Sequence, residues 1–154
     1  MRVREHWRAA GWPTFLIADD STDPHSPYAP GQPGHDFHPE LAPHASDQVV
    51  HKSAGGAFSG TDLATRLRQG GLQTLVVGGF MTNRCVATTV HAGADLGFEI
   101  IVLGDGTATV GLTDRRGRTW CADDVHELAL ADLAATAGVR VCTSEALLAA
   151  LTPL

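Results

Sequence analysis

Five short runs of Val, Ile and Leu, separated by stretches with helical periodicity, constrain this chain more than any other feature. The runs are nearly continuous in apolar residues, as strands buried on both faces require. Strands that alternate with helices predict βαβ units, and therefore a parallel sheet with helices on both faces. The predicted strands are 14–18, 48–51, 74–78, 98–103 and 139–142.

Capping residues and glycines indicate where helices begin and end in the segments between these runs. Thr61 and Asp62 offer a cap and an early acid, and Gly97 and Gly138 fall where a helix C-terminus favours glycine. The 154 residues have the length of one domain, so we predict a single three-layer α/β/α domain over residues 1–154. The predicted helices are 3–10, 61–68, 83–96, 123–137 and 144–151.

The charge balance excludes several classes of partner. The chain has 11 Lys and Arg against 17 Asp and Glu, a formal charge of −6 that repels nucleic acid and anionic membrane surfaces. No apolar run approaches the roughly 18 residues that span a bilayer, and the charged start leads into no apolar stretch of signal-peptide type. We expect a cytoplasmic protein that binds neither nucleic acid nor a membrane.

The segment 20–47 differs from the rest of the chain, because it holds six of the eight prolines and four histidines. We expect a long, ordered surface loop, since loops of this length are usually functional. The histidine spacing fits no standard ligand pattern and the three cysteines form no CxxC pair, so no metal site is predicted. Without a P-loop or a complete GxGxxG motif, no cofactor is expected either.

Cys85 is the residue that mechanism alone singles out. It follows the predicted strand 74–78 and stands where the helix 83–96 begins. The unsatisfied amides of a first helical turn carry partial positive charge, which favours the nucleophilic thiolate form of a cysteine there. A free cysteine is more often a small buried hydrophobe, so this position alone leaves both interpretations open.

Lys52 stands at a similar place, directly after the predicted strand 48–51. Open α/β sheets bind ligands at the carboxyl ends of their strands, where a lysine can stabilise a thiolate or help to protonate a leaving group. The alternative is a solvated lysine at a strand end. Asp19, Asp20 and Asp105 also end strands and are the available carboxylates, although such positions are common in turns and caps.

The sequence around Lys52 and Cys85 resembles the isochorismatase-like cysteine hydrolases, which include nicotinamidases, N-carbamoylsarcosine amidohydrolases and ureidoacrylate amidohydrolases. The resemblance extends from about Val3 to Leu151 and implies a Rossmann-like parallel sheet. The segments that carry it are 30–34, 37–41, Val50 and Lys52 with 57–63, 75–79, 82–86 with Thr89 and Gly97, and 102–105.

This resemblance implies a hydrolase of non-peptide C–N bonds in a small-molecule substrate. Cys85 would be the nucleophile that forms an acyl-enzyme, and Lys52 the catalytic lysine. A cis peptide between Phe80 and Met81 would aim the backbone amides of Met81 and Cys85 at the oxyanion. The same resemblance points to substrate-binding roles for Phe58, Phe80 and Thr82, and to a homo-oligomer.

One departure from the family pattern concerns the start of the chain. Family members begin with a strand that ends in the triad aspartate, and that central strand lies between the strands that correspond to 14–18 and 74–78. This sequence starts in the following helix, so we expect an N-terminally truncated domain with two unpaired strand edges. A start recorded downstream of the true one, a fragment of an ordinary hydrolase and a decayed member remain open explanations.

The missing aspartate leaves alternatives for function as well. In a complete chain, Asp19 or Asp20 would be the nearest replacement carboxylate. The competing interpretation is a catalytically silent binding or assembly subunit that keeps the fold. A third is a thiol redox sensor in which Cys85 is reversibly oxidised.

Overall fold

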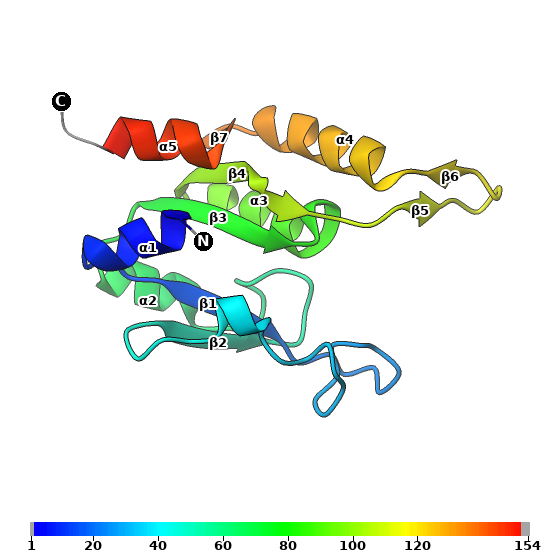
Figure 1. The fold of residues 1–154 in the computed structure, drawn as a ribbon, viewed down its shortest axis with the longest axis horizontal. Coiled ribbons are helices and arrows are strands. Elements are labelled where there is room, and N and C mark those ends of the chain that lie inside the picture. Colours follow the sequence, from blue (N-terminus) through cyan, green and yellow to red (C-terminus); the bar gives the residue numbers. More distant parts are fainter. Residues whose placement is uncertain (1, 152–154) are drawn as a thin grey trace. The chain divides into compact units, whose positions relative to one another are not determined.

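The computed structural model describes residues 2–151. These residues form two compact units that divide after Leu63. Both are built on parallel strands (Figure 1). The predicted α/β architecture with parallel strands is therefore confirmed.

The first unit contains a two-stranded parallel sheet. Helix α1 (Arg2–Ala9) leads to β1 (Phe15–Asp19), and after the long loop and a 3₁₀ turn (Pro39–Leu41) the chain enters β2 (Gln48–Lys52). The two strands pair in parallel without an irregularity, so their carboxyl ends lie side by side.

An ion-pair cluster fastens α1 to the start of β2. Oδ2 of Asp47 accepts hydrogen bonds from Arg4 at 2.6 Å, from Arg8 at 3.3 Å and from the His44 amide at 2.7 Å. Burial by itself would raise the pKa of Asp47, but these donors outweigh it, so the pKa lies below its ordinary value. The cluster connects segments that are about 40 residues apart in the sequence.

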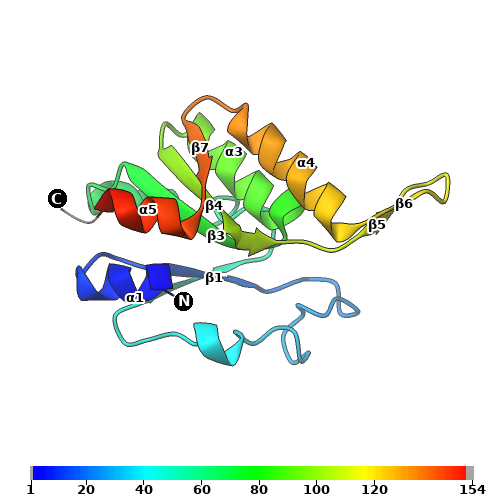
Figure 2. The ribbon, with the colours of Figure 1, turned by 45° about the horizontal axis from the view of Figure 1, so that its top comes forward.

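The second unit contains a three-stranded parallel sheet in the order β3-β4-β7. Figure 2 shows α3 and α5 on opposite sides of this sheet, and α4 packs against α3 and β7. The core includes fully buried Val90, Val102 and Leu133. The elements are α2 (Leu63–Gln69), β3 (Thr74–Phe80), α3 (Ala87–Asp95), β4 (Glu99–Ala108), α4 (Ala122–Ala134), β7 (Val139–Cys142) and α5 (Ser144–Leu151).

Strand β4 and a short hairpin are among the features of this unit that differ from the sequence prediction. Strand β4 continues five residues beyond the predicted end at Leu103. In this extension the Gly106 carbonyl passes close to β3 at Gly78, where a Cβ would lie only 2.9 Å from its oxygen. A short antiparallel hairpin of β5 (Leu112–Thr113) and β6 (Thr119–Trp120) was not predicted. Two residues in each strand are too few to show an alternating pattern.

The strands of the described residues form separate sheets rather than one. Among residues 2–151, β1 pairs with β2 alone and β3 pairs with β4 alone. Within the described residues, β1 and β3 therefore each have one edge without a strand partner. In the same range, no helix combines the length and apolar character that a membrane span requires.

Candidate active site

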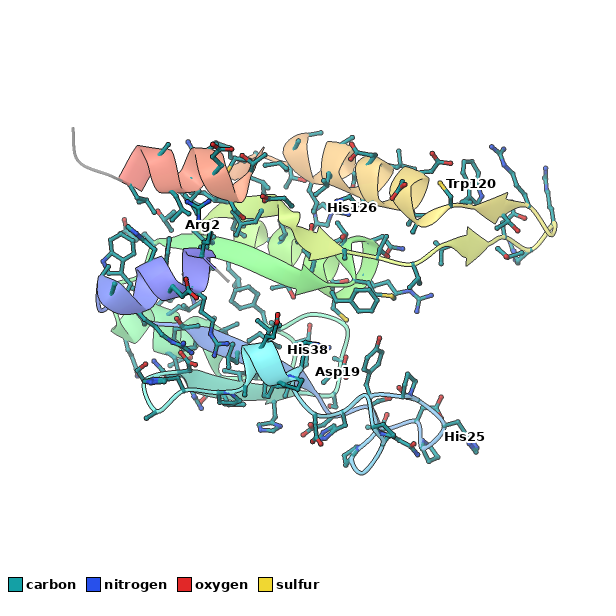
Figure 3. All side chains as sticks on the ribbon, viewed as in Figure 1. Arg2, Asp19, His25, His38, Trp120 and His126 are labelled. Atoms are coloured by element: carbon teal, nitrogen blue, oxygen red, sulfur yellow. The ribbon has the colours of Figure 1, made fainter. Side chains whose placement is uncertain are left out.

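Lys52 and Asp19 meet at the carboxyl edge of the first sheet. In-register pairing of β1 with β2 places the two residues opposite each other. Nζ of Lys52 lies 2.5 Å from Oδ2 of Asp19 and donates to the Ala54 carbonyl at 2.8 Å. The lysine side chain is only 4% exposed, and the Asp19 carboxylate places a negative charge next to the buried ammonium. Figure 3 labels Asp19 at this end of β1.

The neighbouring Asp20 holds two imidazoles instead. Its Oδ1 lies 2.9 Å from Nε2 of His35, and its Oδ2 lies 3.1 Å from Nδ1 of His51. The hydrogen bond with His35, followed by that with His51, lowers the pKa of the Asp20 carboxyl. Of the two candidate replacement carboxylates, Asp19 is therefore the one bound to Lys52. Within the described residues, no group of three His, Cys, Asp or Glu side chains could hold a metal ion.

Cys85 lies in a tight turn that connects β3 to α3. The peptide bond between Phe80 and Met81 is cis, at the position that the resemblance implied. Residues Thr82–Val86 then form a single π-helical turn, which the Val86 amide closes by donating to the Met81 carbonyl at 3.2 Å. The sequence predicted a regular helix from residue 83. Instead, Cys85 precedes α3 and stands half-buried in this turn.

Side chains from distant segments hold this turn in place. The Thr82 hydroxyl lies 2.9 Å from Nδ1 of His126, a residue of α4 that is labelled in Figure 3. Nε2 of that histidine lies 3.1 Å from the Gly104 carbonyl. On the next residue, Asn83 accepts a 2.5 Å hydrogen bond from Thr109. The sequence carries no signal for the contact between Thr82 and His126, because the two residues are 44 positions apart.

The predicted site residues divide between the two units. Lys52 and the half-buried Phe58 belong to the first unit. The second unit brings together Phe80, Met81, Thr82 and Cys85 at one strand end. Phe80 is 48% exposed, so about half of its surface is open to solvent. Thr82 is fully buried within the protein.

Residues 2–146 match the isochorismatase domain. This chain belongs to the isochorismatase family. A solved structure of an isochorismatase-family protein from Chromobacterium violaceum is 43% identical, with a TM-score of 0.91 over 97% of this chain and 77% of that one. The Bacillus subtilis isochorismatase family protein YrdC is 30% identical over 86% of this chain and 71% of its own length.

Part of the chain is similar to a family member named for an activity. The ureidoacrylate amidohydrolase RutB from Serratia proteamaculans is 39% identical over 83 residues, which are 54% of this chain and 34% of that protein. An amidohydrolase cleaves a C–N bond with water. Members of the isochorismatase family thus include hydrolases of amide-type bonds.

Proposed function

We propose that this chain hydrolyses a non-peptide C–N bond of a small molecule through a thioester on Cys85. The observation that carries the proposal is the place of Cys85, in a tight turn at the carboxyl end of the parallel strand β3. Open α/β sheets bind their ligands outside such strand ends. Membership of the isochorismatase family and similarity to an amidohydrolase support a reaction with amide-type bonds.

The reaction adds one water molecule across the C–N bond in two steps. The Cys85 thiol gives up its proton and its sulfur attacks the carbonyl carbon. The C–S bond forms as the C–N bond breaks, and the nitrogen takes up that proton and leaves as an amine or ammonia. Water then cleaves the thioester, which releases the carboxylic acid and restores the thiol. The backbone amide of Met81, together with that of Cys85, stabilises the oxyanion that develops in each step.

The other predicted site residues have catalytic, positioning, substrate-binding or structural roles in this proposal. Lys52 serves as the catalytic lysine, and Asp19 is a positioning residue that holds its ammonium at 2.5 Å. Phe58 and the exposed ring of Phe80 supply apolar surface for the substrate. We assign Thr82 to the support of the turn rather than to substrate contact, because its side chain is fully buried.

The test compares Cys85→Ser with Cys121→Ser, which removes an exposed thiol elsewhere in the second unit. The probes are p-nitrophenyl acetate as an activated acyl donor and a panel of primary amides, N-carbamoyl compounds and ureido acids. We expect mass spectrometry to find an acyl group on Cys85, and turnover to disappear in Cys85→Ser while Cys121→Ser keeps it. Full turnover by Cys85→Ser would overturn the proposal.

The same experiment separates the hydrolase from a catalytically silent subunit. A silent subunit would bind members of the panel without releasing product and would form no thioester. A redox sensor would instead oxidise reversibly at Cys85 and turn over no amide.

A further inference from the structure

We propose that His126 is a positioning residue for the Cys85 turn and acts through the buried hydroxyl of Thr82. The inference rests on the proposed function, because it concerns the geometry of the nucleophile assigned there. Its physical basis lies in contacts within the second unit alone.

The two contacts of His126 define its tautomer. The Gly104 carbonyl, 3.1 Å from Nε2, can only accept a hydrogen bond, so Nε2 carries the proton. In the neutral imidazole Nδ1 is then an acceptor, and the Thr82 hydroxyl, 2.9 Å away, must donate to it. The imidazole therefore links the β4 backbone to the turn through a chain of two directed hydrogen bonds.

Burial makes this chain of contacts hard to replace. Thr82 is 0% exposed, so water cannot take over the role of the imidazole without a rearrangement of the turn. A buried hydroxyl that loses its partner carries the full cost of desolvation. The turn would shift to find another acceptor, and its other residues would move with it.

The effect reaches Cys85 because the turn is short. Thr82 and Cys85 lie in the same five-residue π-helical turn, three positions apart. Thr109 holds the adjacent Asn83 through a second hydrogen bond, so two neighbouring residues of the turn are anchored to segments outside it. Loss of one anchor lets the turn rotate about the other, and small displacements of a nucleophile reduce rates strongly.

The experiment uses Thr82→Val, His126→Ala and the double variant in the full chain. Thr82→Ser is the rescue variant, because it keeps the hydroxyl. Thr136→Val and His91→Ala form a matched control, since this second Thr–His pair at 3.4 Å connects the segment after α4 to α3 and neither residue belongs to the Cys85 turn. The readouts are kcat and KM with p-nitrophenyl acetate, and the rate at which iodoacetamide alkylates Cys85, followed by peptide mass spectrometry.

We expect Thr82→Val and His126→Ala each to lower kcat by about tenfold with little change in KM, and to change the alkylation rate of Cys85. The double variant should be no slower than the slower single variant, because both changes break the same link. Thr82→Ser and the control pair should retain the kcat of the wild type.

Two results would overturn the inference. One is an unchanged kcat and alkylation rate in folded Thr82→Val and His126→Ala; the other is a double variant whose loss equals the product of the single losses. If His126→Ala does not fold, the comparison of Thr82→Val with Thr82→Ser decides. Failure of the proposed function has a different signature, because Cys85→Ser would then keep turnover whatever the Thr82 variants do.

Discussion

Oδ2 of Asp19 lies 2.5 Å from Nζ of Lys52, directly across the first sheet from it. The contact follows from strand register, because Asp19 ends β1 and Lys52 ends β2 at the same level. Burial of a lysine ammonium costs free energy unless a counter-charge and hydrogen bonds replace the water around it. Asp19 supplies the counter-charge, and the Ala54 carbonyl accepts one of the hydrogen bonds.

Replacing Asp19 by Asn should therefore destabilise the protein. The amide keeps the shape of the carboxyl but removes its negative charge from beside the buried ammonium, so we expect the free energy of unfolding to fall by about 1–3 kcal/mol. The double variant Asp19→Asn with Lys52→Met should be more stable than Asp19→Asn alone. Urea denaturation measures both differences, and equal stability of Asp19→Asn and wild type would contradict this account.

Asp47 should make stability depend on pH in the acid range. Its pKa in the folded protein lies below the ordinary value of 3.8, so its contribution is present above that pH and is lost as the pH falls further. Thermal unfolding of Asp47→Asn should begin at a lower temperature than that of wild type at neutral pH. The difference should shrink below about pH 3.8. Asp36→Asn, at a fully exposed carboxyl, should match wild type throughout.

A side chain at Gly78 should disturb the end of β3. A Cβ there would lie 2.9 Å from the Gly106 carbonyl oxygen of β4, at the point where the register of the two strands shifts. The added Cβ is fixed to the β3 backbone and its neighbour is a backbone oxygen of β4, so one strand must move. We expect Gly78→Ala to lower the free energy of unfolding by about 1–3 kcal/mol and to reduce turnover. Gly70→Ala is the control, since a Cβ there meets only ordinary contacts. A Gly78→Ala variant as stable as this control would exclude the clash.

Two leucines of α4 should respond very differently to the same change. Leu133 is fully buried, whereas Leu128 on the same helix is 70% exposed. Leu133→Ala should cost about 2–5 kcal/mol because it opens a cavity in the core. Leu128→Ala should change the stability by about 0.5 kcal/mol or less. Chemical denaturation compares the two variants, and similar losses would argue against the packing of α4 described above.

The order and type of the main elements could be predicted because their signals are local. Strand β7 spans Val139–Cys142 and helix α5 spans Ser144–Leu151, and both pairs of bounds are the predicted ones. The apolar run 74–78 likewise predicted β3, which ends at Phe80, five residues before Cys85. Hydrophobic periodicity and capping residues act within a few positions of the chain, so a single sequence contains them.

The partners of the site residues were decided only by the tertiary structure. Thr82 and His126 are 44 positions apart, and Asp19 and Lys52 are 33 apart. Neither spacing carries a signal, because such contacts depend on how strands pair and how α4 packs on the second sheet. The sequence by itself determined which residues are candidates for chemistry. Long-range packing decided which of them are buried, which carboxylate compensates Lys52, and what holds the turn of Cys85.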